Sequence, residues 1–588
     1  MKFVLAFLCL GIFFSAQAQS ALDYVPENAV AVFRINPSKI NQKMDIAEIQ
    51  QLEMFDMVLE QITGSLPPEQ QADAYKMLTS PSQYGMDLMQ PYCFFAAPGG
   101  ESLNLFGMVM ALSDANTFGT TMQKQLAGMA PEDALEKVDG FNRFSLGNDM
   151  FLCWNEQVAL IASGQVQIDY SNYWNLTEEE LAEQENAQAG LITAGVSDLM
   201  GKGLGKSIAK NNRYQQSTAG SSDMHFWLDY ESISEWTNSL AGGMADLGTL
   251  GMGSYMEMMK GYYKDMDLDM GIEFIEGAMK MSVNLFADDQ LLSIYEEGYD
   301  EKLNKDFIKY IDAESTLGYV FFNMDLDDVM EGTYEYLKPL IREVPEYGEI
   351  GIAALEVLDV AVDEDALFDL IEGDMLLTFN GIKEVTEEVT TIEYDDDFNP
   401  TEVTKTVTNS IPQISFFMGY ENGEGWEKIM NLGMLFGVVE KSGSMYSFSD
   451  IPDLEDLTLH MRMQDGIMVM SNDMDFVQNK AASGYSATIS KDEQKKLKKN
   501  AQVMRMDFSK LLEMGMAMSG GEGEMDEIAK IFEEVGFTTM EVLTSKKIDG
   551  KVQTEMFLNL KDQETNALRS FLMLMNKAFL EEMGGARM

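Results

Sequence analysis

The chain has 588 residues, of which 46% are hydrophobic, and a formal net charge of −56. This much apolar material is enough for two or more packed cores, so a disordered chain is not expected. The charge repels phosphate backbones and anionic lipid headgroups, which excludes nucleic acid as an expected partner. Cations and basic proteins remain possible partners, but acidity on this scale also simply keeps a protein in solution.

The N-terminus has the pattern of a secretory signal. Lys2 gives a positive start, Phe3 to Phe14 is an apolar run, and Ala16-Gln17-Ala18 is a small-x-small cleavage site. We therefore expect residues 1–18 to be removed after Ala18 and the protein to be exported, with periplasmic and extracellular fates both open. The apolar run is too short to span a bilayer, no later stretch is long enough, and Cys9 lacks the small residue that should precede a lipidated cysteine.

The rest of the sequence repeats itself: six blocks occur twice in the same order, which is the signature of an internal duplication. We predict a first module over residues 19–305 and a second over 306–588. The matched blocks are Pro26–Ile40 with Ala313–Asp327, Asp87–Ala97 with Asp369–Phe379, Phe106–Phe118 with Ile414–Trp426, Phe151–Ala162 with His460–Ser471, Met224–Tyr230 with Gln502–Phe508, and two closing hairpins that turn at Glu276-Gly277 and Asp549-Gly550.

Each module is predicted to alternate strands and helices. Strands outnumber parallel crossovers, so we predict an α+β fold made of two tandem copies of one module with antiparallel sheets and packed helices. Capping boxes at Thr177-x-x-Glu180 and Ser490-x-x-Glu493 open a helix in each copy. One segment, 383–412, has only a short counterpart in the first copy, and its alternating residues predict a protruding hairpin.

The first strand after the signal, Tyr24 to Asn36, resembles the opening of a family of exported bacterial envelope proteins and lipoproteins. Gly85-Met86-Asp87 and Leu112-Ser113-Asp114 also fit that family at a strand entry and a strand exit. The family is known only as a domain of unknown function. The resemblance implies an envelope location for a non-lipidated member, without a known activity and without family catalytic residues to transfer.

The chain has only two histidines, and the repeat helps to decide whether each is a functional or a structural residue. His225 aligns with Val503 and His460 aligns with Phe151, so each occupies a position that is apolar in the other copy. We interpret both as strand residues rather than catalysts or metal ligands, and we predict no catalytic, cofactor-binding or metal-binding residue from them.

Two cysteines remain after removal of the signal, and export would permit a disulfide. Cys93 aligns with Met375 on an inward face, whereas Cys153 aligns with Arg462, which should face water. We therefore expect one thiol inside and one outside, both free, with a bridge as the alternative.

Carboxylates are too numerous to identify a site. Asp229 and Asp507 follow equivalent strands and precede helices, where a carboxylate caps exposed N–H groups. The run Asp395, Asp396, Asp397 offers oxygen ligands suited to Ca²⁺ and is the one metal candidate, although it lacks the glycine and terminal glutamate of an EF-hand loop.

The chain has 47 methionines, with dense groups in Met244 to Met270 and in Met514 to Met525. They are interpreted as core filler, with an apolar lip for a lipid or peptide as the alternative and Cu(I) ligation as a third. The leading hypothesis is thus an exported, non-enzymatic envelope protein with a binding or structural role. The alternatives are a carboxylate-dependent hydrolase of envelope polysaccharide or peptide, and a carrier of apolar ligands; an envelope protein or an apolar ligand is the expected partner.

Overall fold

The computed structural model divides the chain into two compact units. Unit 1 comprises Met1–Ile275, Met281–Asp288 and Phe571–Met588, and unit 2 comprises Glu276–Lys280 and Asp289–Ser570. The structure describes residues 21–64, 68–100, 103–126, 135–138, 140–147, 149–166, 177–202, 206–233, 261–299, 305–342, 348–361, 370–371, 373–394, 400–448, 458–481, 483–485, 489–512 and 535–585. The predicted signal, the Asp395–Asp397 run and most of both Met-rich segments lie outside these residues.

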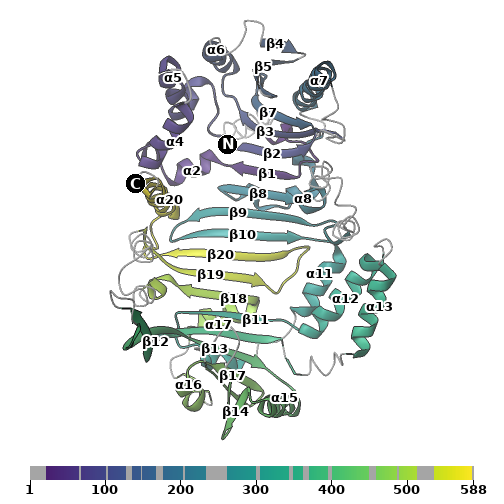
Figure 1. Cartoon of the computed structure of the whole chain (residues 1–588). Helices are drawn as coiled ribbons and strands as arrows, with labels where there is room; N and C mark the ends of the chain where they lie inside the picture. Colours follow the sequence, from purple (N-terminus) through teal and green to yellow (C-terminus); the bar gives the residue numbers. More distant parts are fainter. Residues whose placement is uncertain are drawn as a thin grey trace, which may run out of the picture. The chain divides into compact units, whose positions relative to one another are not determined.

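Unit 1 is built on an antiparallel sheet in the order β4-β5-β6-β7-β3-β2-β1-β8-β9 (Figure 1). Its strands are β1 (Ala31–Ile35), β2 (Tyr92–Pro98), β3 (Leu103–Ala111), β4 (Leu135–Val138), β5 (Phe141–Gly147), β6 (Met150–Trp154), β7 (Val158–Val166), β8 (Met224–Asp229) and β9 (Asp267–Ile275). The following strand, β10 (Ala278–Phe286), has residues in both units.

Helices cover both faces of this sheet. The α-helices are α2 (Pro37–Lys43), α3 (Ile46–Ile49), α4 (Glu53–Thr63), α5 (Pro68–Thr79), α6 (Ala115–Leu126), α7 (Glu178–Lys202) and α8 (Asn212–Gln215), and the 3₁₀ turns are η1 (Ala21–Tyr24), η2 (Pro81–Tyr84), η4 (Ile208–Lys210) and η5 (Thr218–Gly220). Ile192 and Val196 of α7 pack into one core with Leu160 of β7. Phe118 of α6 packs with Trp154 in a second core. The period-2 alternation of the strands supplies an apolar row to each core.

Unit 2 contains an antiparallel sheet in the order β14-β15-β16-β17-β13-β12-β11-β18-β19-β20. Its strands are β11 (Gly318–Asn323), β12 (Asp374–Tyr394), β13 (Pro400–Gly419), β14 (Val439–Ser442), β15 (Met445–Phe448), β16 (Leu459–Gln464), β17 (Ile467–Ser471), β18 (Asn500–Asp507), β19 (Phe537–Ser545) and β20 (Val552–Leu560). Pairing between β12 and β13 continues to Tyr394 opposite Pro400, so residues 383–394 and 400–412 form the outer part of a long hairpin.

The helices of unit 2 are α11 (Asp289–Gly298), α12 (Leu326–Arg342), α13 (Gly348–Ala361), α15 (Gly423–Phe436), α16 (Met474–Asn479) and α17 (Lys491–Lys499), with the 3₁₀ turn η7 (Lys305–Tyr310). Leu497 of α17 and Phe476 of α16 pack with Phe417 in one core. Met430 of α15 packs with Met461 in another. The last helix, α20 (Ala567–Gly585), has residues in both units. Helices together with large antiparallel sheets confirm the α+β class.

Several predicted local features form. Thr177 and Glu180 exchange the two hydrogen bonds of a capping box, and so do Ser490 and Glu493. Asp229 accepts from the N–H of Ser232 at 2.9 Å and Asp507 from that of Lys510 at 3.2 Å, which confirms that both carboxylates cap the backbone after a strand. These contacts span only three residues, which is why the sequence alone reveals them.

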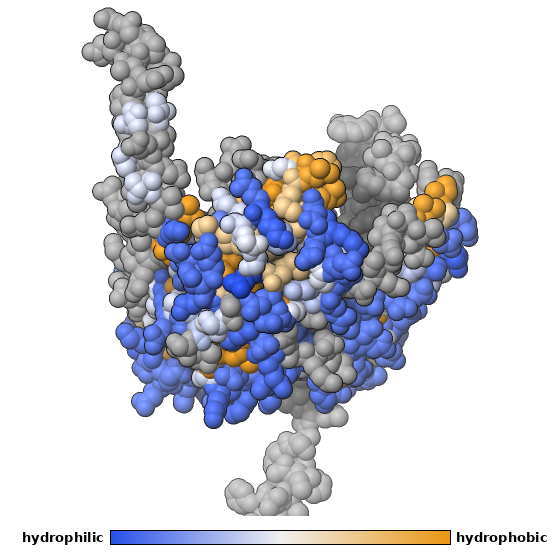
Figure 2. All heavy atoms as spheres, turned by 90° about the horizontal axis from the view of Figure 1, so that it is seen from below, coloured by the Kyte–Doolittle hydropathy of each residue, from blue (hydrophilic) through white to orange (hydrophobic). Residues whose placement is uncertain are grey.

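The surface agrees with the composition. On the face in Figure 2, most described residues are hydrophilic, and apolar residues occur in separate groups. In unit 2 the end of α15 exposes large apolar side chains, with Leu435 at 79% and Phe436 at 72% exposure. Among the described helices, none combines the length and apolar content that crossing a membrane requires.

Candidate functional site

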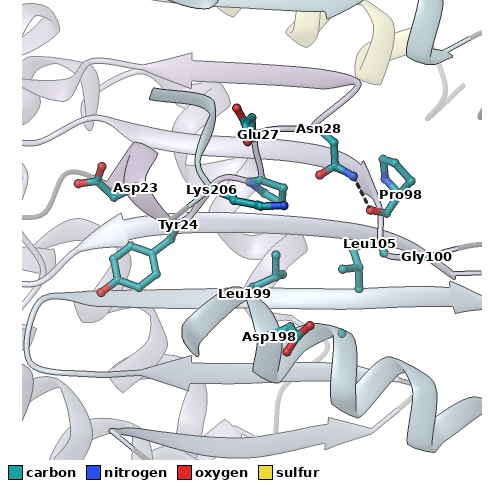
Figure 3. Close-up of a pocket in the computed structure, with 13 residues that line it drawn as sticks. Asp23, Tyr24, Glu27, Asn28, Pro98, Gly100, Leu105, Asp198, Leu199 and Lys206 are labelled. Atoms are coloured by element: carbon teal, nitrogen blue, oxygen red, sulfur yellow. Dashed lines mark hydrogen bonds between the residues drawn. The ribbon is translucent and has the colours of Figure 1, made fainter. Parts of the chain in front are cut away.

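A cavity of about 540 Å³ lies in unit 1 where the loop before β1 meets the end of β2, strand β3 and the last turns of α7 (Figure 3). The sequence predicted no site here, because its lining comes from four separate segments. The residues are Asp23, Tyr24, Pro26, Glu27, Asn28, Pro98, Gly99, Gly100, Leu105, Gly195, Asp198, Leu199 and Lys206.

Hydrogen bonds hold the loop before β1 in place. Asn155, in the β6–β7 turn, donates its Nδ2–H to the Tyr24 hydroxyl at 2.8 Å. Burial raises the pKa of Tyr24, and the Asn155 hydrogen bond opposes this rise only in part. Asn28 donates to the carbonyl of Pro98 at 3.1 Å, which joins the loop to the end of β2. The N–H of Ile208 donates to the carbonyl of Val25 at 2.9 Å, so the segment after α7 is attached to the same loop.

Glycines shape two walls of the cavity. A Cβ on Gly195 would lie 2.6 Å from Cδ2 of Leu103, so a larger residue there would require the Leu103 side chain to move. At Gly100, φ is +147°, a conformation that side chains disfavour, and a Cβ there would meet nothing within 4 Å. The backbone at Gly100 is therefore open to close approach by a ligand.

The cavity combines an apolar floor with charged walls. Leu105 of β3 and Leu199 of α7 point into the same space that the Lys206 side chain crosses (Figure 3). Asp23, Glu27 and Asp198 give the lining three carboxylates against a single lysine ammonium. Glu27 and Lys206 are exposed, and within the described residues neither makes an ion pair or a side-chain hydrogen bond. Such a cavity is equipped to bind a ligand that has both charged and apolar parts.

A second cavity, in unit 2, has a different character. It measures about 270 Å³ and lies beside the start of β11 and next to α17. Its basic groups already have partners, because Arg505 pairs with Glu493 and Lys510 donates to the carbonyl of Glu314 at 2.8 Å. Since those cations are neutralised or bonded within the protein, the cavity of unit 1 is the stronger candidate for a ligand site.

His225 is a strand residue that takes part in a buried hydrogen-bond network, which the repeat comparison did not predict. It lies on β8 with 2% exposure, and its Nε2 is 2.6 Å from Oδ1 of Asp269 on β9. Asp269 also accepts from Asn284 Nδ2 at 2.6 Å and from the N–H of Thr218 at 3.1 Å. The pattern was missed because Asp269 is 44 residues away in the sequence.

This buried network has the contacts of a structural element. The other ring nitrogen of His225, Nδ1, has no hydrogen-bond partner among the described residues, so no hydroxyl or thiol there completes a Ser-His-Asp arrangement. Tyr214 packs edge-on against the imidazole at 5.5 Å between ring centroids. His460, in unit 2, bonds through Nδ1 to Ser447 Oγ at 2.9 Å. Burial lowers the pKa of His460, and nearby Lys383 lowers it further.

The prediction that Cys153 faces water is wrong. Both Cys93 and Cys153 are 0% exposed, belong to the core beneath α7 and are free thiols. The error came from the Arg462 counterpart, because a single aligned side chain does not reveal that α7 packs on this face of β6 and β7. Burial raises the pKa of each thiol to about 12.

Among the described residues, no group of three or more His, Cys, Asp or Glu side chains is arranged to hold a metal ion. Asp395, Asp396 and Asp397, the predicted Ca²⁺ candidate, fall outside those residues and stay a prediction.

The chain belongs to the family described as "Domain of unknown function (DUF4836)", whose match covers residues 23–568. This confirms the resemblance seen in the sequence. No curated protein matches. A solved structure titled "Structure of crystal form IV of TP0453" is similar at 9% identity and a TM-score of 0.23, covering 45% of this chain and 79% of that one. A likeness at that level has no bearing on fold or function.

Proposed function

We propose that this chain is an exported envelope protein that binds a small ligand in the cavity of unit 1 and does not catalyse a reaction on it. The observation that carries the proposal is one cavity of about 540 Å³ in which apolar side chains lie beside two charged side chains, Glu27 and Lys206, that have no partner among the described residues. Small-molecule sites typically have volumes of roughly 300–1,000 Å³, mainly apolar walls and a few polar groups. The signal-like residues 1–18 support export, and N-terminal sequencing of the mature protein should begin at Gln19.

The hydrolase alternative has less support. Such an enzyme needs two acids across a cleft, one with a raised pKa. Burial raises the pKa of Asp267 to about 6, although Arg213 opposes the rise. The Asp267 carboxylate, however, is 1% exposed and is bonded to Arg213 at 2.9 Å. Asp267 lies on β9 and is not part of the cavity lining, so it acts as an ion-pair partner and not as an acid that could reach a ligand there.

The carrier alternative depended on the Met-rich segments, most of which lie outside the described residues. The cavity of unit 1 instead takes its apolar surface from leucine, proline and tyrosine. A purely apolar cargo would also desolvate Glu27 and Lys206 without pairing them, which is unfavourable. We therefore favour a ligand with polar groups.

We also propose that residues 19–305 and 306–588 are two copies of one module. Matched in chain order, β1 to β9 correspond one to one with β11 to β19, and the strand pairings are the same in both sets. One helix, α6 or α15, follows the third strand in each. An experimental structure with a different strand order in either half would refute the duplication.

Retention of a ligand by the purified protein tests the binding role. Protein purified from its native envelope would be analysed by native mass spectrometry for bound small molecules, and again after incubation with an extract of the same envelope. Leu199→Trp should fill the cavity and abolish retention. Leu191→Trp is the matched control, because Leu191 lies on the same helix and is 46% exposed outside the cavity. If both variants retain what the wild type retains, or if the wild type retains nothing, the proposed function fails.

A further inference from the structure

We infer that the cavity of unit 1 takes a zwitterionic ligand of the peptide class: a short peptide with free amino and carboxyl ends and an aliphatic side chain. The inference rests on the proposed binding function and names the chemistry of the ligand.

The argument starts from two opposite charges. Glu27 lies in the loop before β1 and Lys206 in the segment after α7, and both line the cavity. They do not form an ion pair with each other, nor does either pair with another described residue. Because an unpartnered charge in a partly enclosed space loses hydration when a ligand covers it, the ligand that binds best is one that pairs both.

The other carboxylates of the cavity determine how much the amino end and the carboxyl end of the ligand each contribute to binding. Asp23 and Asp198 line the same cavity and add negative charge, although each also has an interaction within the protein. A ligand ammonium is therefore attracted by Glu27 and, more weakly, by Asp23 and Asp198, whereas Lys206 is the one basic residue among the lining residues that attracts a ligand carboxylate. A ligand that is only anionic is disfavoured by this excess, and a ligand that is only cationic leaves Lys206 unpaired. The excess predicts that the amino end contributes more to affinity than the carboxyl end.

The rest of the lining suits a peptide. Leu105 and Leu199 form an apolar surface on which an aliphatic side chain can pack (Figure 3). The open backbone at Gly100 allows a main chain to approach closely, since a side chain there is absent and would be strained. The contact between Asn28 and the Pro98 carbonyl holds this edge of the cavity in position.

Four forms of one dipeptide test the inference by isothermal titration calorimetry: leucyl-leucine, its N-acetyl form, its C-terminal amide and the doubly blocked form. The free dipeptide should bind best. Acetylation, which removes the ammonium, should weaken binding about fivefold or more, and amidation, which removes the carboxylate, should weaken it less, in line with the modest strength of exposed ion pairs.

Variants of Glu27 and Lys206 test which residue binds the amino end of the dipeptide and which binds the carboxyl end. Glu27→Gln should weaken the free dipeptide and leave the N-acetyl form unchanged, and Lys206→Gln should weaken the free dipeptide and leave the amide unchanged. Glu156→Gln and Lys137→Gln are matched controls, since both side chains are exposed on unit 1 away from the cavity lining. Leu199→Trp should weaken all four ligands.

The outcomes distinguish a failure of the zwitterion inference from a failure of the proposed binding function. Equal binding of the free and doubly blocked forms would overturn the zwitterion, and so would absence of binding by every form. In either case retention of another molecule by the wild type but not by Leu199→Trp would leave the proposed function standing. Binding of the free dipeptide that survives both charge variants would also overturn the inference.

Discussion

Substitution of Asp269 is predicted to destabilise unit 1 strongly. Its side chain is 0% exposed and accepts hydrogen bonds from His225, Asn284 and the N–H of Thr218. Asp269→Ala would leave two buried donors, on His225 and Asn284, and the half-buried N–H of Thr218 without this acceptor. Each orphaned donor costs roughly 1–3 kcal/mol, so a total loss of about 4 kcal/mol or more is expected after partial relaxation. Asp269→Asn keeps an acceptor oxygen and should cost less.

Urea unfolding followed by hydrogen exchange measures this effect locally. Peptides from β8 and β9 should lose protection in Asp269→Ala at urea concentrations where the wild type stays protected. Asp265→Asn is the control, because Asp265 pairs with Arg213 but is 46% exposed, an exposed pair contributes only about 0–1 kcal/mol, and asparagine tolerates the left-handed φ of 58° at this position. If Asp269→Ala costs no more than Asp265→Asn, the His225–Asp269–Asn284 network does not stabilise unit 1 and the reasoning fails.

Three further predictions concern other groups. Since burial raises the pKa of Cys93 and Cys153 to about 12, neither thiol should be alkylated in the native protein at pH 8, and both should react after unfolding; native labelling would contradict their burial. The pKa of Asp267 is raised by burial from 3.8 to about 6, so the folded state binds this proton more tightly and its stabilising effect is lost as pH rises from about 4 to above 6. Relative to Asp267→Asn, the free energy of unfolding of the wild type in urea should thus fall by about 2 kcal/mol between pH 4 and pH 7, and parallel pH profiles would exclude this. Ser490→Ala removes the capping box of α17 and should cost about 1 kcal/mol, measured as faster amide exchange in the helix, whereas unchanged exchange would show that packing of Leu497 alone fixes it.

The sequence predicted the features that depend on neighbours along the chain. Capping boxes, strand-end carboxylates and hairpin turns are decided within three or four residues, as at Ser490 or at the Asp465-Gly466 turn, where φ is 52° and 77°. The α+β class follows from the same local patterns, because strands and helices differ in their apolar period.

Contacts between distant segments could not be predicted in this way. The cavity of unit 1 depends on Asn155 reaching Tyr24 across 131 residues, and on α7 lying against β3 through a glycine. The pairing of His225 with Asp269 depends on strand register, which places Asp269 opposite Trp227 and brings its carboxylate to the neighbouring histidine. A repeat comparison states only which positions correspond. It assigned Cys153 to the surface because its counterpart is charged, although the helix above each position differs.

On the proposed duplication, the corresponding positions show how the two units came to differ. Trp227 lies opposite Asp269 in unit 1, and the matching pair in unit 2 is Arg505 opposite Glu541. Arg505 pairs with Glu493 of α17, and Glu541 pairs with Lys496 of the same helix at 2.5 Å. Unit 2 therefore uses its charges to bind its own helix to the sheet. Unit 1 buries its strand-pair carboxylate in a histidine network, and in its cavity Glu27 and Lys206 have no ion-pair partner among the described residues, so both charges are available to a ligand.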